Sequence, residues 1–222
     1  MLSHNCNDNG EEQSGWTEED WHCWREHGYF LLRRAVPKFY ILRLLSLMPT
    51  EADRQTALWN KDLSAIRSHP YMWDILLRYR VYEAFSGLWK QPGLWLNLEG
   101  LRIRGGEAQR CSVQSPKIEG CISLNAQQLK FYYADHSGRR LEIALEVGDL
   151  LIYASEKLEL VSQTADLLPV TMVPVNMVPL HDSDEDSRRG RILFWKEIDQ
   201  SGQHGRVVLN ELGERLLGLS PW

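Results

Sequence analysis

Histidines beside carboxylates are the residues of this chain that could hold a transition metal or transfer protons. Apart from His22 and His27, which belong to the first predicted helix, two such clusters occur, Asp135-His136 and His181-Asp182-Ser183-Asp184. The first lies in Asp135–Gly138, a stretch typical of a hairpin turn, where these residue types are favoured for backbone reasons alone. The second opens His181–Arg189, which predicts an acidic, solvated surface loop. Weak binding of a divalent cation through its carboxylate oxygens is the alternative.

An arginine near the end of the chain could grip a carboxylate. Arg191 opens a predicted strand, Ile192–Trp195, and a guanidinium can hold a carboxylate through two parallel hydrogen bonds. Arg188 or Arg189 could do the same, because the length of the preceding loop is uncertain. An ion pair with the acidic loop explains an arginine there equally well. The chain contains no GxSxG, phosphate-binding loop, dinucleotide fingerprint or HExxH pattern.

Composition narrows the class of protein. A formal net charge of −5 gives no electrostatic case for nucleic acid. Four scattered cysteines without a CxxC spacing predict reduced thiols. The N-terminus lacks the features of a secretory signal, and no apolar run reaches the roughly 18 residues of a membrane span. We therefore expect a cytoplasmic protein that binds neither nucleic acid nor a membrane.

The elements that would position a site centre on Leu141–Leu160. There, a tight turn at Val147-Gly148-Asp149 leads into a continuously apolar strand, Leu150–Tyr153. Such a run is typical of a strand buried on both faces, inside a sandwich or barrel. Further upstream, Leu94–Arg104 alternates apolar and polar residues and predicts another strand.

The first half of the chain predicts helices. Thr17 and Asp20 have the spacing of a capping box, and Gly28 is placed to end that helix before a strand at Tyr29–Leu32. Pro37 suits the first position of a second helix reaching about Met48. Its predicted buried face carries Phe39, Leu42, Leu45 and Met48. His69 and Asn210 are placed as caps of later helices.

Four segments, in order, resemble the phytanoyl-CoA dioxygenase family of iron- and 2-oxoglutarate-dependent oxygenases. They are WTEEDWHCWREHGYFLLRRAVP, HPYMWDILLRYRVYEAFSGLWKQPGLWLNLEGLRIR, GDLLIYASEKL and RRGRILFWKEI, and together they span roughly Trp16–Ile198. The resemblance implies an α+β chain with a mostly β core, a distorted double-stranded β-helix (jelly-roll, cupin-like). Helices from the N-terminal half would pack on one face. One domain would cover residues 16–222, after a disordered tail at residues 1–15.

The resemblance also implies which residues should carry the chemistry. The family holds iron with a His-x-Asp pair after an early core strand and a distal histidine after the GDLLIY-type strand, and a late strand carries the arginine for 2-oxoglutarate. No His-x-Asp or His-x-Glu occurs in this chain. The segment GGEAQRCSVQSPK, where the pair is due, offers only the carboxylate of Glu107. Glu159, or Leu158 with a shift of one residue, stands at the distal histidine.

These substitutions lead to three competing expectations. The first is a family member that has lost its iron site and needs no cofactor. It would bind or rearrange a small molecule, or support an active member of the family. The second is an active Fe(II)/2-oxoglutarate oxygenase acting on a small, secondary-metabolite-type substrate. It would use substitute ligands drawn from Glu107, His136, Glu159 and His181, with Arg191 or Arg189 gripping the carboxylate. The third is an interaction module whose interior is filled by aromatic side chains.

Overall fold

The computed structural model describes residues 16–47, 69–98, 118–135, 137–161, 172–180, 185–200 and 207–222. The elements in chain order are α1 (Glu18–His27), β1 (Tyr29–Leu32), α2 (Lys38–Leu45), α4 (Pro70–Leu76), α5 (Tyr79–Trp89), β2 (Leu94–Leu96), β3 (Ile118–Ser123), β4 (Gln127–Tyr133), β5 (Arg140–Leu145), β6 (Leu150–Ala154), β7 (Leu158–Leu160), β8 (Met172–Val175), β9 (Met177–Pro179), α6 (Glu185–Gln200) and α7 (Glu211–Leu216).

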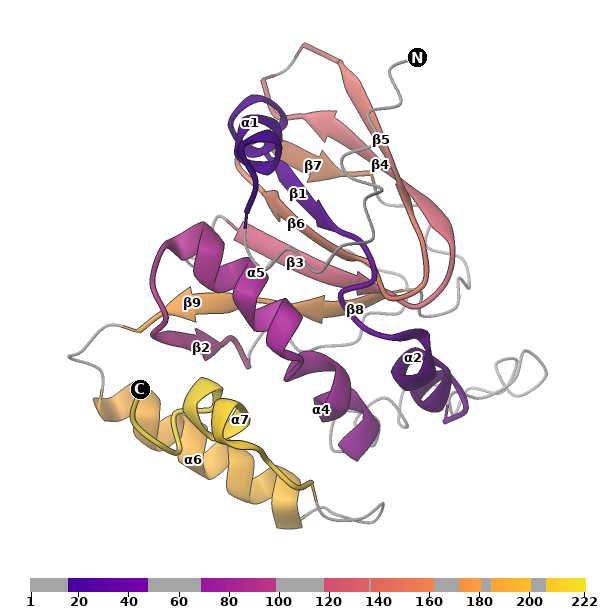
Figure 1. Ribbon diagram of the computed structural model, residues 1–222. Helices are drawn as coiled ribbons and strands as arrows, with labels where there is room; N and C mark the ends of the chain where they lie inside the picture. The colour runs from indigo at the N-terminus through magenta and orange to yellow at the C-terminus, as the bar shows by residue number, and fades with distance from the viewer. Residues whose placement is uncertain are drawn as a thin grey trace.

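Helices and antiparallel sheets make up the described fold (Figure 1). One sheet has the strand order β1-β6-β3-β8, a second has the order β5-β4-β7, and β2 pairs with β9. Between β3 and β8 the chain crosses repeatedly from the four-stranded to the three-stranded sheet and back. Such crossings are typical of sandwiches with Greek-key connections.

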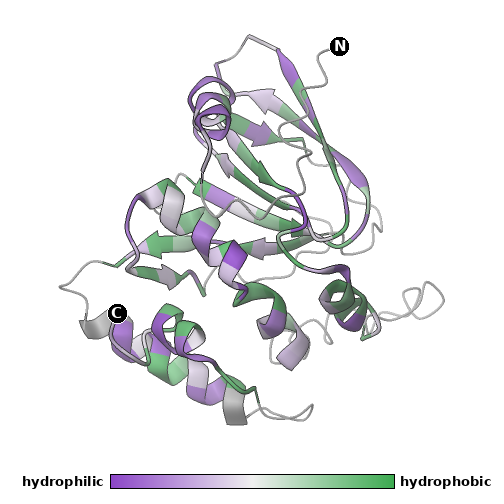
Figure 2. Ribbon diagram, in the orientation of Figure 1, coloured by the Kyte–Doolittle hydropathy of each residue, from purple (hydrophilic) through white to green (hydrophobic). Residues whose placement is uncertain are grey.

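Strand β6 lies at the centre of the packing. All five of its residues are buried, as their continuous apolar character predicts. Leu151 and Tyr153 belong to an apolar cluster with Leu129 and Phe131 of the three-stranded sheet. Leu150 and Ile152, on the opposite face, belong to the larger core shared with the helices. Figure 2 shows β6 mostly in green, the colour of hydrophobic residues.

The helices cover the face of the four-stranded sheet that points away from the three-stranded sheet. Helices α2, α4 and α5 share this core with strands β1, β3, β6 and β8. The C-terminal helices α6 and α7 also contribute to it, and α7 contacts β2 (Figure 1). Helices from both halves of the chain therefore cover this face, whereas the sequence placed only those of the N-terminal half on it.

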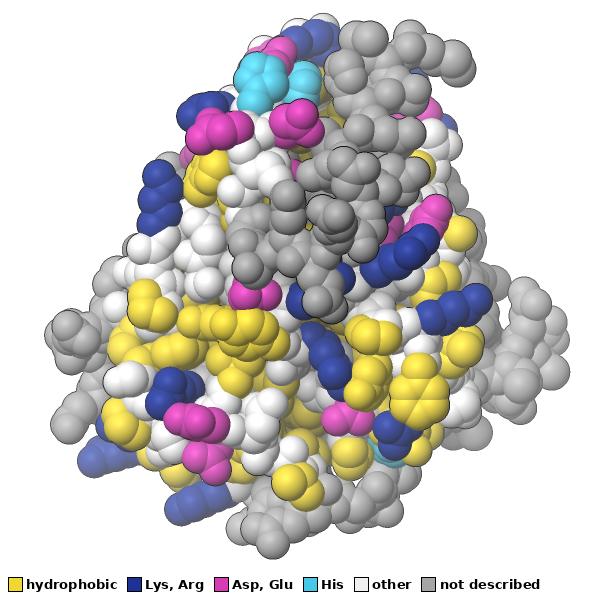
Figure 3. Space-filling view, in the orientation of Figure 1, with side chains coloured by type: hydrophobic (Ala, Val, Ile, Leu, Met, Phe, Trp, Pro, Cys, Tyr) yellow, Lys and Arg dark blue, Asp and Glu magenta, His cyan; other side chains and the backbone are white. Residues whose placement is uncertain are grey.

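Helix α2 buries a different face from the predicted one. Ile41 and Leu44 are fully buried, whereas Phe39 is 63% exposed and Leu42 is 52% exposed. The helix is apolar on nearly every side, so its spacing does not identify the face that packs. Figure 3 shows hydrophobic side chains at the surface in the region of α2, α4 and α5.

The predicted helix ends are largely confirmed. Thr17 and Asp20 form the capping box, and Gly28 ends α1 with φ of +78°. The side chains of His69 and Asn210 accept hydrogen bonds from backbone N–H groups as the N-caps of α4 and α7. Pro37 is itself the N-cap of α2, one position before the predicted one.

The segment predicted as the strand Ile192–Trp195 is instead part of helix α6. Arg191, Phe194, Trp195 and Ile198 are at least partly buried, and this i, i+3, i+4, i+7 spacing is that of an amphipathic helix. The predicted acidic loop His181–Arg189 is also wrong in part, because residues 185–189 form the first turns of α6. Residues 181–184 lie outside the described part of the chain.

The predicted strand Leu94–Arg104 is observed over Leu94–Leu96, and residues beyond Leu98 are outside the described ranges. Both faces of β2 are buried, so the alternation of residue types does not separate core from solvent here. None of the described helices combines the length and apolar character needed to cross a lipid bilayer.

Candidate functional site

A glycine at the start of β6 fixes how this strand enters the core. Gly148 has φ of +86°, a conformation that residues with a Cβ rarely adopt. The Val36 carbonyl lies so close that a Cβ on Gly148 would overlap it. The Gly148 carbonyl accepts a 3.0 Å hydrogen bond from Val36 N–H. The turn before β6 is therefore locked against the segment between β1 and α2.

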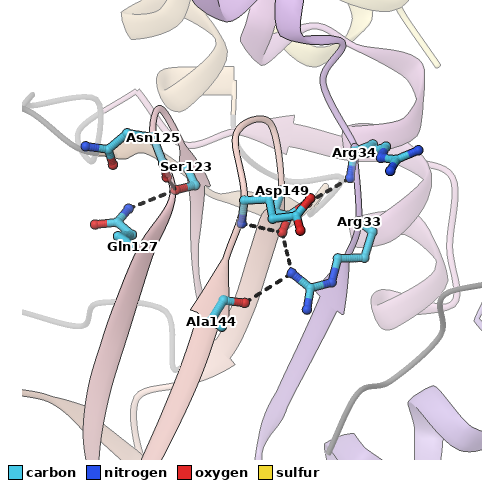
Figure 4. Close-up of polar contacts among 8 residues, drawn as sticks. Arg33, Arg34, Ser123, Asn125, Gln127, Ala144 and Asp149 are labelled. Carbon is cyan, nitrogen blue, oxygen red and sulfur yellow. Dashed lines mark hydrogen bonds and ion pairs between the residues drawn. The ribbon is translucent and has the colours of Figure 1, made fainter.

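Asp149 also holds the turn before β6 against the end of β1 (Figure 4). Its fully buried carboxylate accepts hydrogen bonds from Arg34 N–H at 2.9 Å, from Glu146 N–H at 2.8 Å and from the Arg33 guanidinium at 2.6 Å. Arg33 also donates to the Ala144 carbonyl at 3.1 Å. Because these donors hold two backbone segments together, the Gly-Asp turn acts as a structural anchor that positions β6.

The other end of β6 is where the resemblance places the distal histidine. A tight turn follows β6, in which Lys157 N–H donates to the Ala154 carbonyl at 2.9 Å. Leu158 is next, 1% exposed, and its side chain belongs to the apolar cluster between the sheets. Glu159 pairs with Tyr132 in the ladder and is exposed. Of the two candidates for this position, Leu158 is the inward-facing residue.

Helix α1 covers this end of the sandwich. Ala154 N–H donates to the Gly28 carbonyl at 2.8 Å, and Lys157 Nζ donates to the Arg25 carbonyl at 2.8 Å. Cys23 of α1 belongs to the cluster between the sheets. His27 Nδ1 lies 3.2 Å from the Tyr133 hydroxyl, and burial raises the pKa of that phenol. The interior beside Leu158 is therefore packed by apolar groups.

The four-stranded sheet carries polar side chains at this same end, which the sequence analysis did not single out as site residues. Tyr153 of β6 pairs with Glu119 of β3, and its hydroxyl donates to Glu119 Oε2 at 2.7 Å. Asn176, between β8 and β9, donates from Nδ2 to the Ile118 carbonyl at 2.8 Å. The sequence indicates this site only through Glu119, an acidic residue that shares one side of a strand with Cys121, two residues later.

Asn176 has an unusual environment. Its backbone carbonyl accepts from Asn97 N–H at 2.7 Å, which continues the β2–β9 pairing. Its Oδ1 atom is buried, and no described residue donates a hydrogen bond to it. A buried acceptor without a donor costs free energy, on the order of 1–3 kcal/mol.

The buried thiol of Cys121 is a poor nucleophile in this structure. Cys23 and Cys121 are both buried. Burial, with a smaller contribution from the negative charge of Glu119, raises the pKa of Cys121 to about 12. Since the thiolate is the reactive form, Cys121 is a packing residue here. Cys6 and Cys111 lie outside the described residues.

Arg191 contacts the outer edge of β2. Its Nη2 donates to the Leu96 carbonyl at 2.6 Å, and its guanidinium carbon lies 4.6 Å from the centre of the Trp95 ring. The Trp222 indole donates to the Leu94 carbonyl at 3.0 Å. Arg189 is exposed. Whether Arg191 or Arg189 also grips a carboxylate stays a prediction.

The structure describes only some of the remaining candidates for metal ligands. Glu107, His136 and His181 lie outside the described residues. Asp135 accepts from Ser137 N–H at 3.0 Å and from Arg139 Nη2 at 2.6 Å, and the contacts with Ser137 and then Arg139 lower its pKa. In the described ranges no three His, Cys, Asp or Glu side chains are grouped so as to hold a metal ion.

The chain shares its fold with a hypothetical protein from Escherichia coli, JW0805. The two are 13% identical, and the match has a TM-score of 0.54 over 91% of this chain and 82% of that chain. HygX from Streptomyces hygroscopicus, solved with nickel and 2-oxoglutarate, is a looser match at 13% identity and a TM-score of 0.48, over 74% of this chain and 87% of that one.

A further loose match is SnoK, a non-heme alpha ketoglutarate dependent carbocyclase from nogalamycin biosynthesis. It is 10% identical, with a TM-score of 0.45 over 89% of this chain and 95% of that chain. No protein-family model and no curated protein sequence matches the chain.

Proposed function

We propose that this chain is a phytanoyl-CoA dioxygenase-like protein with a double-stranded β-helix core that has lost its iron site and works by binding a small molecule. The observation that carries the proposal is the inward position of Leu158. An isobutyl side chain cannot coordinate a metal, and it occupies the position at which the family pattern expects an imidazole. The only other residue that can be aligned there, Glu159, is exposed.

The described residues also do not fit the 2-oxoglutarate part of the family pattern. The resemblance assigned the carboxylate-binding arginine to a late strand, but the RILFWKEI segment is helical. The last strands of the described sheets are β8 and β9, and Met172–Pro179 contains no basic residue. A dicarboxylate would therefore lack a cationic partner on these strands.

The donor set at the end of the sandwich favours a different chemistry. Iron(II) in such enzymes needs two imidazoles and a carboxylate arranged around open positions. On the four-stranded sheet the polar side chains here are an exposed carboxylate, a phenol and an amide, those of Glu119, Tyr153 and Asn176. A described imidazole at this end, that of His27, lies beside the Tyr133 hydroxyl. These groups can hydrogen-bond an organic ligand and orient it. Support of an active relative through a protein contact is the second form that this non-redox role can take.

Metal content after anaerobic incubation with iron(II) and 2-oxoglutarate tests the proposal. We expect less than stoichiometric iron after gel filtration, because carboxylates and water alone bind iron(II) weakly. Leu158→His restores one imidazole at the inward position and should raise iron retention. Glu159→His, at the exposed position next to it, is the matched control. Stoichiometric iron in the unmodified chain, lost on changing His136 or His181 to alanine, would contradict the proposal.

A further inference from the structure

The pairing register aligns three polar side chains across adjacent strands. Glu119 is paired directly with Tyr153. On the other side of β3, Gly120 pairs with Val175, so the next residues along, Glu119 and Asn176, face each other one step beyond the last ladder pair. The hydrogen bond from Asn176 Nδ2 to the Ile118 carbonyl keeps the amide at this edge. We refer to Tyr153, Glu119 and Asn176 as the polar row.

The polar row lies at the rim of the space between the sheets. Tyr153 and Cys121 belong to the cluster formed with the three-stranded sheet, and Glu119 shares the side of β3 that carries Cys121. Glu119, in the middle of the row, is exposed, whereas Tyr153 on one side is buried and Asn176 on the other is half-buried. The ring of Phe131 packs edge-on against Tyr153, with 5.1 Å between ring centres.

The polar row has more hydrogen-bond acceptors than donors. Tyr153 donates its hydroxyl proton to Glu119 Oε2, and Asn176 uses its Nδ2 on Ile118. This leaves the second oxygen of a charged carboxylate and the buried Asn176 Oδ1, to which no described residue donates. A matching ligand must supply donors and a positive charge. An ammonium group has three donors and no acceptor.

We propose that the polar row binds the ammonium group of a small organic amine. Glu119 supplies the countercharge, and Asn176 Oδ1 gains its missing donor. Because Oδ1 is closed to solvent, a shift of the Asn176 side chain accompanies binding. The inference rests on the proposed function, because it assigns to this end of the sandwich an organic cation in place of iron.

Ligand-detected NMR titrations with three probes of one shape test this assignment. The probes are cyclohexylamine, cyclohexanol and cyclohexanecarboxylate, which differ only in the polar group. We expect the amine to bind most tightly and the carboxylate to bind least. Glu119→Gln should weaken amine binding about tenfold or more, as expected for the loss of a charge-assisted hydrogen bond. Glu142→Gln, which neutralises an exposed carboxylate on β5, is the matched control.

Two more variants keep the test decisive if Glu119→Gln is poorly folded. Asn176→Leu should weaken amine binding while leaving selectivity over the carboxylate in place. Tyr153→Phe keeps the ring and releases Glu119 Oε2 as a further acceptor, so amine binding should be retained or improved. Equal binding of the three probes, no binding of the amine, or an unchanged affinity in Glu119→Gln would overturn the inference. A negative amine titration together with absent iron binding would overturn this inference alone.

Discussion

The Arg33 guanidinium lies 2.6 Å from the fully buried carboxylate of Asp149, and the two residues are 116 positions apart in the chain. This contact joins the end of β1 to the turn that begins β6, and it sits beside the Gly148–Val36 backbone hydrogen bond. These contacts therefore fix the start of β6. Tyr153 lies near the other end of that strand, and the turn before Leu158 follows it.

Asp149→Asn should lower the free energy of unfolding by about 3 kcal/mol, because it leaves Arg33 without its countercharge and turns an amide toward backbone N–H donors. Urea unfolding measures this loss. Asp74→Asn, at an exposed and longer ion pair with Arg43, should change stability by no more than about 0.5 kcal/mol. Similar losses in the two variants would mean that the Asp149 contact does not anchor the turn.

Gly148→Ala should destabilise the protein by more than about 2 kcal/mol, since it adds a Cβ at positive φ against the Val36 carbonyl. Gly138 provides the matched control, because it also has positive φ but has open space around it. Gly138→Ala should cost only about 1 kcal/mol. Thermal melts of both variants would reveal the difference, and a smaller effect at Gly148 would refute the close approach.

The central strand, the Gly-Asp turn and the helix caps could be predicted from sequence because each depends on local chemistry. Leu150–Ala154 is uniformly apolar, and Thr17 and Asp20 satisfy N–H groups within one turn. The RILFWKEI segment forms a helix and not the strand that the family resemblance implies, because its buried residues recur at helical spacing. The polar row could not be predicted, because it depends on the register between β3, β6 and β8, which are far apart in the chain.

The outer edge of β2 provides a further test, because Arg191 and Trp222 donate to its alternate carbonyls. Exposed edge strands pair readily with other chains. Arg191→Ala should lower stability by about 1–2 kcal/mol and promote self-association. Arg189→Ala, at an exposed position of the same helix, should have little effect. Calorimetry and light scattering measure the two outcomes. An unchanged Arg191→Ala protein would show that this edge needs no cap.

Cys121 should resist alkylation by iodoacetamide in the native protein at mildly alkaline pH and react readily in denaturant, because burial raises its pKa to about 12. In the unfolded chain the thiol has a pKa of about 8.5. The contribution of the protonated thiol to stability is therefore complete below that pH and is lost as the pH rises toward the pKa of the folded state. Cys121→Ala should therefore flatten the alkaline decline in stability. Peptide mass mapping that finds native Cys121 labelled rapidly would contradict its burial.

Succinate formation tests the central claim most directly. The chain is incubated with iron(II), ascorbate and 2-oxoglutarate, with and without cyclohexylamine, and succinate is compared with a control without protein. With Leu158 at the inward position and no His-x-Asp in the sequence, the account predicts succinate at the level of that control. Succinate above the control that is abolished by His136→Ala or His181→Ala would contradict the account and establish an oxygenase with substitute ligands.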